Sequence, residues 1–297
     1  MKNIFLSIVI MIATTLPSIA QKNFQGAATY ESKTSTAEFK KRFEGNKDMT
    51  PEMQKMIEER VQKMLEKTFV LNFDKTSSLY KEEEKLDATG QAGGMGRMIT
   101  SMMGAGGTYY KDVKSKSYTD YREFMGKEFL IKDSLQTLKW KMEPETRVIG
   151  GYNCFKATAI KIASKSDLKS MRLKKENKNV PKSEDKDKKT NFMDEIETPK
   201  EITVTAWYTP EIPVNQGPEG YWGLPGLILE VNDGQTTILC SKVVLNPKEK
   251  AEIKAPTSGT VTNQKDFDET VMKKLKEVQE MRQSQGGNGR PQMGFGR

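Results

Sequence analysis

The chain has 297 residues, of which 35% are hydrophobic and 30% charged, with a formal net charge of +8 and no histidine. The lack of histidine excludes Ser-His-Asp and Cys-His catalysis and His-ligated zinc. The two cysteines are far apart, and neither GxGxxG between a strand and a helix nor GxxxxGK[ST] occurs. We therefore expect neither an enzyme nor a cofactor.

The first 20 residues have the pattern of a secretory signal peptide. Lys2 precedes a short apolar run from Ile4 to Ile12, and Ser18-Ile19-Ala20 places small residues at a cleavage site. The run is too short to span a bilayer. Because Gln21 follows in place of a lipid-modified cysteine, we expect a protein without a membrane-spanning segment, periplasmic or secreted after cleavage near Ala20. Export makes nucleic acid a poor partner for the positive charge.

A strand is predicted over 27–33 and a helix over 50–67. Thr50 is a typical N-cap, and Pro51 and Glu52 favour a first helical turn. Apolar residues at helical spacing give the helix one hydrophobic stripe: Met53, Met56, Ile57, Val61, Met64 and Leu65. The stripe predicts packing on the core. The alternative is an amphipathic helix that contacts a membrane or a partner.

Two segments interrupt the pattern. Residues 89–107 are rich in glycine and methionine and predict a flexible insertion. Four thioethers in it are possible Cu(I) ligands: Met95, Met98, Met102 and Met103. Residues 161–200 mix many lysines with acids and have one aromatic residue, Phe192. This composition predicts a solvated insertion and argues against nucleic-acid binding.

Short strands fill most of the remaining chain. They are expected at 69–73, 79–80, 108–113, 117–123, 127–133, 137–143, 151–160, 201–209, 227–231 and 236–245. Asp233-Gly234 predicts a two-residue hairpin loop. Strands without intervening helices indicate an antiparallel meander.

The stretch from Gly217 to Val231 contains a Pro-Gly corner. Pro225 and Gly226 favour a type II turn, in which Gly226 has positive φ and Leu224 meets Leu227. Gly223 is expected to allow close backbone packing.

The predicted fold is mainly β with minor α: one curved antiparallel meander sheet, half-barrel-like, over residues 24–250 and covered by the helix at 50–67. Residues 251–297 are expected to form a polar linker, a helix at about 264–283 and a disordered tail. Cys154 and Cys240 fall in strands, either as a disulfide or as two buried thiols. Glu230 is an acid of interest whose ordinary interpretation is a solvent-facing strand position.

Three blocks carry a resemblance to a known family. They are Trp140 with Glu145–Ala157, then Val204–Pro213, then the stretch from Gly217 to Glu230. The hexapeptide in the third block is the signature: Gly223, Leu224, Pro225, Gly226, Leu227 and Ile228. Over roughly residues 110–245 the chain resembles the GLPGLI family of exported bacterial proteins, although its Lys-rich insertion departs from the usual spacing. The resemblance implies export and genes near TonB-dependent receptors, and it implies no activity and no catalytic residue.

Three roles follow as hypotheses. The first is a non-enzymatic binding or chaperone-like envelope protein for a lipophilic ligand or an outer-membrane segment. The second is an accessory subunit that docks on a TonB-dependent outer-membrane receptor through residues 217–222 and the tail. The third is copper handling by the methionines of 89–107. The candidate contact residues are Trp207, Tyr208, Tyr221 and Trp222. The oligomeric state is left open.

Overall fold

The computed structural model describes residues 24–37, 40, 50–83, 107–164, 172–173, 196–197 and 200–285. The predicted signal peptide, nearly all of the Gly/Met-rich insertion, most of the Lys-rich insertion and the C-terminal tail lie outside these residues. No helix in the described part of the chain is long and apolar enough to cross a membrane.

The fold is mainly β, with one open sheet of 12 strands in the order β14-β6-β5-β4-β3-β2-β1-β13-β12-β11-β8-β7. Its strands are β1 (Gly26–Thr34), β2 (Glu66–Phe73), β3 (Ser77–Glu82), β4 (Thr108–Asp112), β5 (Ser117–Phe124), β6 (Lys127–Ser134), β7 (Lys141–Ile149), β8 (Tyr152–Ile162), β11 (Glu201–Thr209), β12 (Leu227–Asn232), β13 (Thr236–Leu245) and β14 (Thr260–Thr262). Neighbours pair antiparallel, except that β14 runs parallel to β6. The sheet is thus mixed, while the mainly β prediction is confirmed.

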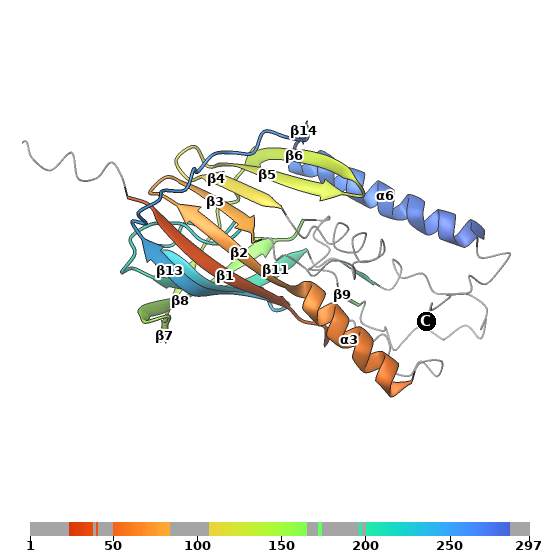
Figure 1. The fold of residues 1–297 in the computed structure, drawn as a ribbon, viewed down its shortest axis with the longest axis horizontal. Coiled ribbons are helices and arrows are strands. Elements are labelled where there is room, and N and C mark those ends of the chain that lie inside the picture. The colour runs from red at the N-terminus through yellow and green to blue at the C-terminus, as the bar shows by residue number, and fades with distance from the viewer. Residues whose placement is uncertain are drawn as a thin grey trace, which may run out of the picture.

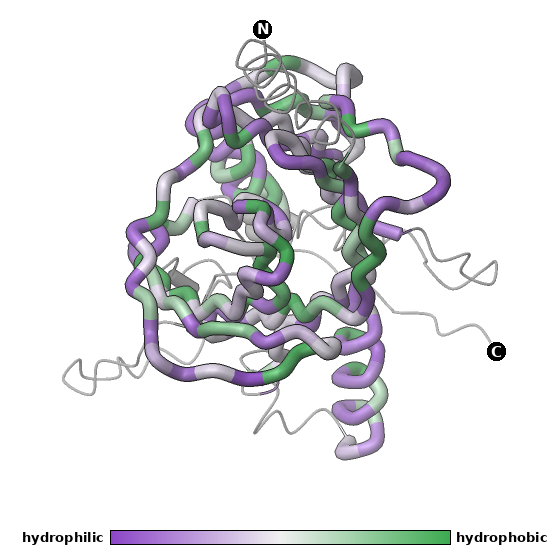
Figure 2. The backbone as a smooth tube through the Cα atoms, turned by 90° about the vertical axis from the view of Figure 1, so that its left-hand side faces the viewer, coloured by the Kyte–Doolittle hydropathy of each residue, from purple (hydrophilic) through white to green (hydrophobic). Residues whose placement is uncertain are grey.

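The N-terminal strand β1 joins two halves of the sheet. It pairs with β2, which begins the meander to β6, and with β13, which ends the run from β7. The sheet curves, so the two halves face each other (Figure 1). Seen from the side, hydrophobic and hydrophilic segments alternate along the strands (Figure 2), as expected when one face of each strand is buried.

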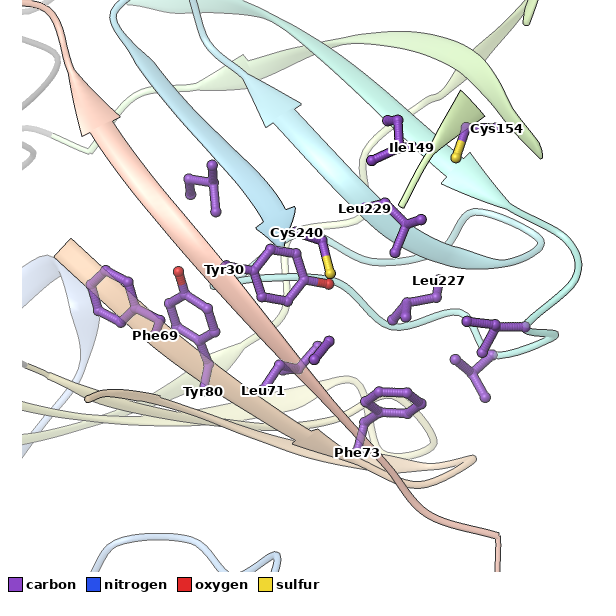
Figure 3. Close-up of a cluster of buried hydrophobic side chains, with 14 residues drawn as sticks. Tyr30, Phe69, Leu71, Phe73, Tyr80, Ile149, Cys154, Leu227, Leu229 and Cys240 are labelled. Carbon is purple, nitrogen blue, oxygen red and sulfur yellow. The ribbon is translucent and has the colours of Figure 1, made fainter. Parts of the chain in front are cut away.

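The main core lies between the two halves. Tyr30 of β1 and Leu71 of β2 are fully buried and share a cluster with Leu229 of β12 (Figure 3). The hydroxyl of Tyr30 donates a 2.7 Å hydrogen bond to the carbonyl of Ile228 in β12. The cluster brings residues of β2 and β12 together, which holds the two halves to each other.

The C-terminal helix α6 (Gln264–Gln285) covers part of the sheet. Phe267, Val271 and Leu275 recur every four residues and are buried against the cluster of β5 and β6. Phe267 meets Phe129 edge-on at 5.2 Å between ring centroids. The predicted helix is confirmed, and residues of the expected linker supply β14, so the C-terminal segment belongs to the β body.

Helix α3 (Pro51–Leu65) forms as predicted, and the Thr50 hydroxyl caps it by accepting the amide of Met53. Its predicted role as the cover of the sheet is wrong. None of its described side chains is buried, and Met56 is 57% exposed. Because β2 begins at the next residue, Glu66, with no loop between, α3 continues off the end of the sheet (Figure 1).

Two further differences concern strands. The strand expected at 137–143 begins only at Lys141, because the segment before it is not a strand and buries Leu135 and Leu138 in two different clusters. Inside the Lys-rich insertion, β9 (Arg172–Leu173) pairs antiparallel with β10 (Ile196–Glu197).

Candidate functional site

A cavity of about 440 Å³ lies between the two halves of the sheet. Its size falls within the range of small-molecule sites, about 300–1,000 Å³. The walls come from strands of both halves, from the loop before β12 and from the first turn of α6. The polar and aromatic side chains in them include Tyr80, Tyr109, Tyr118, Asp120, Arg122, Lys161, Glu219, Tyr221, Gln264 and Asp268.

One wall of the cavity is formed by strands β3, β4 and β5, whose register aligns the side chains that line it. Tyr80 of β3 pairs with Tyr109 of β4, which pairs in turn with Asp120 of β5. Directly paired residues of antiparallel strands point to the same face of a sheet. These three side chains therefore form a row on the inner face, and Arg122 follows two residues along β5 on that face.

The opposite wall is the loop from Gly217 to Tyr221, which Lys111 of β4 fixes in place. Lys111 is fully buried, and its ammonium donates to the carbonyls of Gly217, Glu219 and Tyr221, the last two at 2.8 and 3.1 Å. Tyr109 lies against the same loop, since a Cβ on Gly220 would be 3.1 Å from its hydroxyl oxygen. Burial lowers the pKa of Lys111 to about 7, while the carboxylate of Glu219 opposes the shift.

Tyr80 is the unusual member of the cavity wall. It is 3% exposed and stacks on Phe69 with ring centroids 4.6 Å apart. Within the described residues its hydroxyl has no hydrogen-bond partner. A buried polar group without a partner costs about 1–3 kcal/mol. Burial, together with the carboxylates of Glu219 and Glu82, raises the pKa of Tyr80 well above 10.0, so its hydroxyl stays protonated at neutral pH.

The signature bend differs from its predicted geometry. The amide of Gly226 donates to the carbonyl of Leu224 at 2.8 Å, which closes a γ-turn around Pro225 in place of a type II turn. Positive φ occurs at Gly223 (92°) and not at Gly226. Gly226 is instead required sterically, because a Cβ there would lie 2.1 Å from the carbonyl oxygen of Thr209. The expected roles of the two glycines are thus exchanged.

The two leucines of the bend do not meet. Leu224 packs with Ile228 in the cluster of β8, β11 and β12, whereas Leu227 packs with Tyr30 in the main core. Both are fully buried, so the bend divides its apolar residues between two clusters.

The four predicted contact residues are not gathered at one place. Tyr221 lines the cavity. Trp222 is 7% exposed and its indole donates to the carbonyl of Gln136 at 3.0 Å. Tyr208 is buried and its hydroxyl contacts the sulfur of Met142. Trp207 is half-buried, and Arg147 lies over its ring at 4.2 Å.

Glu230 lies near Trp207 and not in the cavity wall. It alternates in β12 with Leu229 and Val231, which are both buried. Its carboxylate pairs with Arg147, and its side chain is only 14% exposed. The solvent-facing interpretation therefore gives way to an ion pair on the outer side of the sheet, in which Glu230 is mostly covered and Arg147 is 40% exposed.

Cys154 and Cys240, the two residues of the predicted disulfide, are both free, buried thiols in the structure. Cys154 is in β8 and Cys240 in β13, with β11 and β12 between them. Adjacent strands lie about 4.8 Å apart, whereas bridged Cα atoms lie within about 7 Å. Leu229 of β12 belongs to the same cluster as both thiols (Figure 3).

Sequence reasoning missed Lys111, Tyr80, Tyr109 and Asp120. The only signal was period-2 alternation in Tyr109-Tyr110-Lys111, which places a lysine on the inner face beside Tyr109. In the described part of the chain, no group of three or more acids or cysteines is arranged to hold a metal ion. The methionines proposed for copper lie outside the described residues.

The match to a protein family covers part of this architecture. Residues 140–230 match a family described as a protein of unknown function (Porph_ging). The Porph_ging region contains β7, β8, β11 and the loop that Lys111 holds, but not the β3–β5 wall of the cavity. No curated protein matches the chain.

Two solved structures of PNGF-II, in space groups P21 and C2, are also similar. They are 12% and 13% identical to the chain, each with a TM-score of 0.43. Each match covers 84% of this chain and 33% of the other, so the chain spans a third of the length of these proteins.

Proposed function

We propose that this protein is a non-enzymatic binding protein of the cell envelope, which holds a small ligand in the cavity between the halves of the sheet. The observation that carries the proposal is the buried hydroxyl of Tyr80, a residue that lines the cavity, because this hydroxyl has no partner in the described part of the chain. A ligand that hydrogen-bonds to Tyr80 would remove the cost of that unpaired group.

The titratable groups favour binding over catalysis. Burial raises the pKa of Cys154 to about 11 and that of Cys240 to about 12, so neither thiol is a nucleophilic thiolate at neutral pH. Lys111 has a lowered pKa, but its ammonium donates hydrogen bonds to three backbone carbonyls, and Lys111 is not among the residues that line the cavity.

The nature of the walls changes the expected ligand. A lipid or acyl chain is best held by a wall without charges, whereas Asp120, Glu219 and Asp268 are among the lining residues here. We therefore propose a ligand with polar groups in place of the lipophilic ligand expected from the sequence.

The two alternative roles have less support. A receptor-docking role assigns contacts to residues 217–222, but four of these six residues are buried. The copper hypothesis depends on residues outside the described ranges. The proposal includes export with cleavage near Ala20, as the GLPGLI resemblance implies. Peptide mapping of envelope fractions tests both the compartment and the cleavage site.

A blocking variant tests the proposal. Ala163 is half-buried and lines the cavity, so Ala163→Phe should fill part of the space. Ala27 is also half-buried but alternates with the core residue Ala28, so Ala27→Phe adds the same ring on the other face of β1. The wild type and Ala27→Phe should bind dansylamide, an uncharged fluorescent probe, and Ala163→Phe should bind it at least tenfold more weakly (about 1.4 kcal/mol). If the wild type binds no small probe, charged or uncharged, the proposal is wrong.

A further inference from the structure

The cavity wall has an excess of acids over bases, opposite in sign to the chain as a whole. The formal charge of the chain is +8. The cavity is lined by five acids (Asp120, Asp133, Asp233, Asp268 and Glu219) and two bases (Arg122 and Lys161), which gives −5 + 2 = −3. A local charge that opposes the global charge indicates a feature of the site itself, since distant charges are screened beyond about 8–10 Å in physiological salt.

Two of these acids, Asp120 and Glu219, come from opposite walls of the cavity. Asp120 is 2% exposed, and Arg122 donates to it at 2.6 Å from its Nε. Glu219 belongs to the loop that Lys111 holds by its backbone, so its side chain is carried by a fixed segment. Tyr109 lies close to both, because it pairs with Asp120 in the strand register and its hydroxyl lies against Gly220, the residue after Glu219.

Aromatic rings line the same cavity. Tyr109 and Tyr118 are stacked, with centroids 5.0 Å apart and planes 11° apart, and Phe69 and Tyr80 form a second stacked pair. The faces of aromatic rings attract cations, and this attraction strengthens where water is excluded.

The carboxylates of the wall also act on the tyrosines. Apart from burial, carboxylates raise the pKa of each: Glu219 and Glu82 act on Tyr80, and Asp133 and Asp120 on Tyr118. Burial, the larger cause of these shifts, disfavours a charge of either sign, but the carboxylates favour a cation over an anion.

We propose that the cavity is a site for a small organic cation, with an ammonium or guanidinium group on an apolar or aromatic body. The cationic group lies between Glu219 and Asp120, the apolar body contacts the stacked rings, and the hydroxyl oxygen of Tyr80 accepts a hydrogen bond from the ligand. This inference rests on the proposed function and deepens it by assigning the charge of the ligand.

Three probes with one fluorophore and different charges separate the two proposals. Dansylcadaverine is cationic, dansylamide is uncharged and dansylglycine is anionic at pH 7. Wild-type protein should bind dansylcadaverine about tenfold more tightly than dansylamide, and dansylglycine more weakly than either. Equal binding of all three, or preference for the anion, overturns the assignment of charge and leaves the proposed function standing. Binding of none overturns both.

A matched pair of variants assigns the preference to the cavity. Glu219→Gln keeps the shape of the side chain and the backbone carbonyl that Lys111 binds. It should lower the affinity for dansylcadaverine about three- to tenfold and leave that for dansylamide unchanged. Glu31→Gln removes the same charge from an exposed position of β1 and should change neither affinity. If Glu31→Gln and Glu219→Gln have equal effects, the preference is a property of net charge and the proposal is wrong.

Discussion

Lys111→Met should loosen the loop that forms one wall of the cavity. Methionine has nearly the length of lysine and no charge, so it fits the buried position without an added cavity. What it removes is the set of hydrogen bonds from the ammonium to the carbonyls of Gly217, Glu219 and Tyr221. Those bonds join segments 106 to 110 residues apart in the sequence.

The size of the effect follows from two opposing contributions. Each buried carbonyl left without a donor costs about 1–3 kcal/mol. Against this, the substitution removes a buried cation whose desolvation is itself unfavourable. Because the two contributions oppose each other, we take a net cost near the lower bound, about 1 kcal/mol for each of the three carbonyls. The free energy of unfolding should then fall by about 3 kcal/mol and the melting temperature by about 6–12 °C.

Urea unfolding followed by circular dichroism measures the loss, and hydrogen exchange locates it. The amides of Tyr221 and Gly223, which bond to the carbonyls of Pro218 and Asn215, should lose protection in Lys111→Met. Lys132→Met, at an exposed position of β6, is the matched control and should change neither quantity. If Lys111→Met is as stable as the wild type and those amides remain protected, Lys111 does not hold the loop.

Three further predictions concern pH, the signature bend and the thiols. The pKa of Lys111 is about 7 in the folded protein and 10.5 in the unfolded chain, so the unfolded chain binds more protons above pH 7. The free energy of unfolding of the wild type should therefore rise between pH 7 and 8.5, whereas that of Lys111→Met should not. Above about pH 9 the free energy of unfolding should fall, since the pKa of the Cys154 and Cys240 thiols is 9.0 in the unfolded chain but about 11 and 12 in the folded protein. If urea titrations give the same free energy from pH 7 to 10, the shifted pKa values of Lys111 and of the two thiols are both contradicted. Gly226→Ala should prevent soluble folding or cost more than about 3 kcal/mol because of the carbonyl of Thr209, and a variant that unfolds at wild-type urea concentrations would disprove the steric requirement. Protein isolated from an oxidising compartment should react with two equivalents of a maleimide after unfolding in denaturant, whereas no reaction would indicate a disulfide.

Local patterns in the sequence predict most of the elements. The alternation from Glu201 to Thr209 gives β11 with its observed bounds, and the Asp233-Gly234 loop lies between β12 and β13 as expected. The caps of α3 are equally local, because Thr50 and Pro51 act within one turn. Such features depend on neighbouring residues and need no knowledge of the rest of the chain.

The cavity and the covering helix depend on distant partners and could not be predicted in this way. An apolar stripe indicates that a helix is amphipathic but not where its partner lies, so α3 was predicted to cover the sheet and α6 does so instead. Likewise, the spacing of Gly223 and Gly226 suggests a turn, but only the approach of Thr209 shows which glycine needs positive φ and which needs space. The role of Lys111 requires a loop more than 100 residues away.

The most direct test of the account is Tyr80→Phe, with stability and binding measured on the same protein. The substitution removes only the buried hydroxyl that has no partner among the described residues. We predict that the free energy of unfolding stays the same or rises by about 1 kcal/mol, while dansylcadaverine binds several-fold more weakly. A variant that loses stability and binds the probe as tightly as the wild type would show that the hydroxyl serves the fold, and would contradict a ligand site at Tyr80.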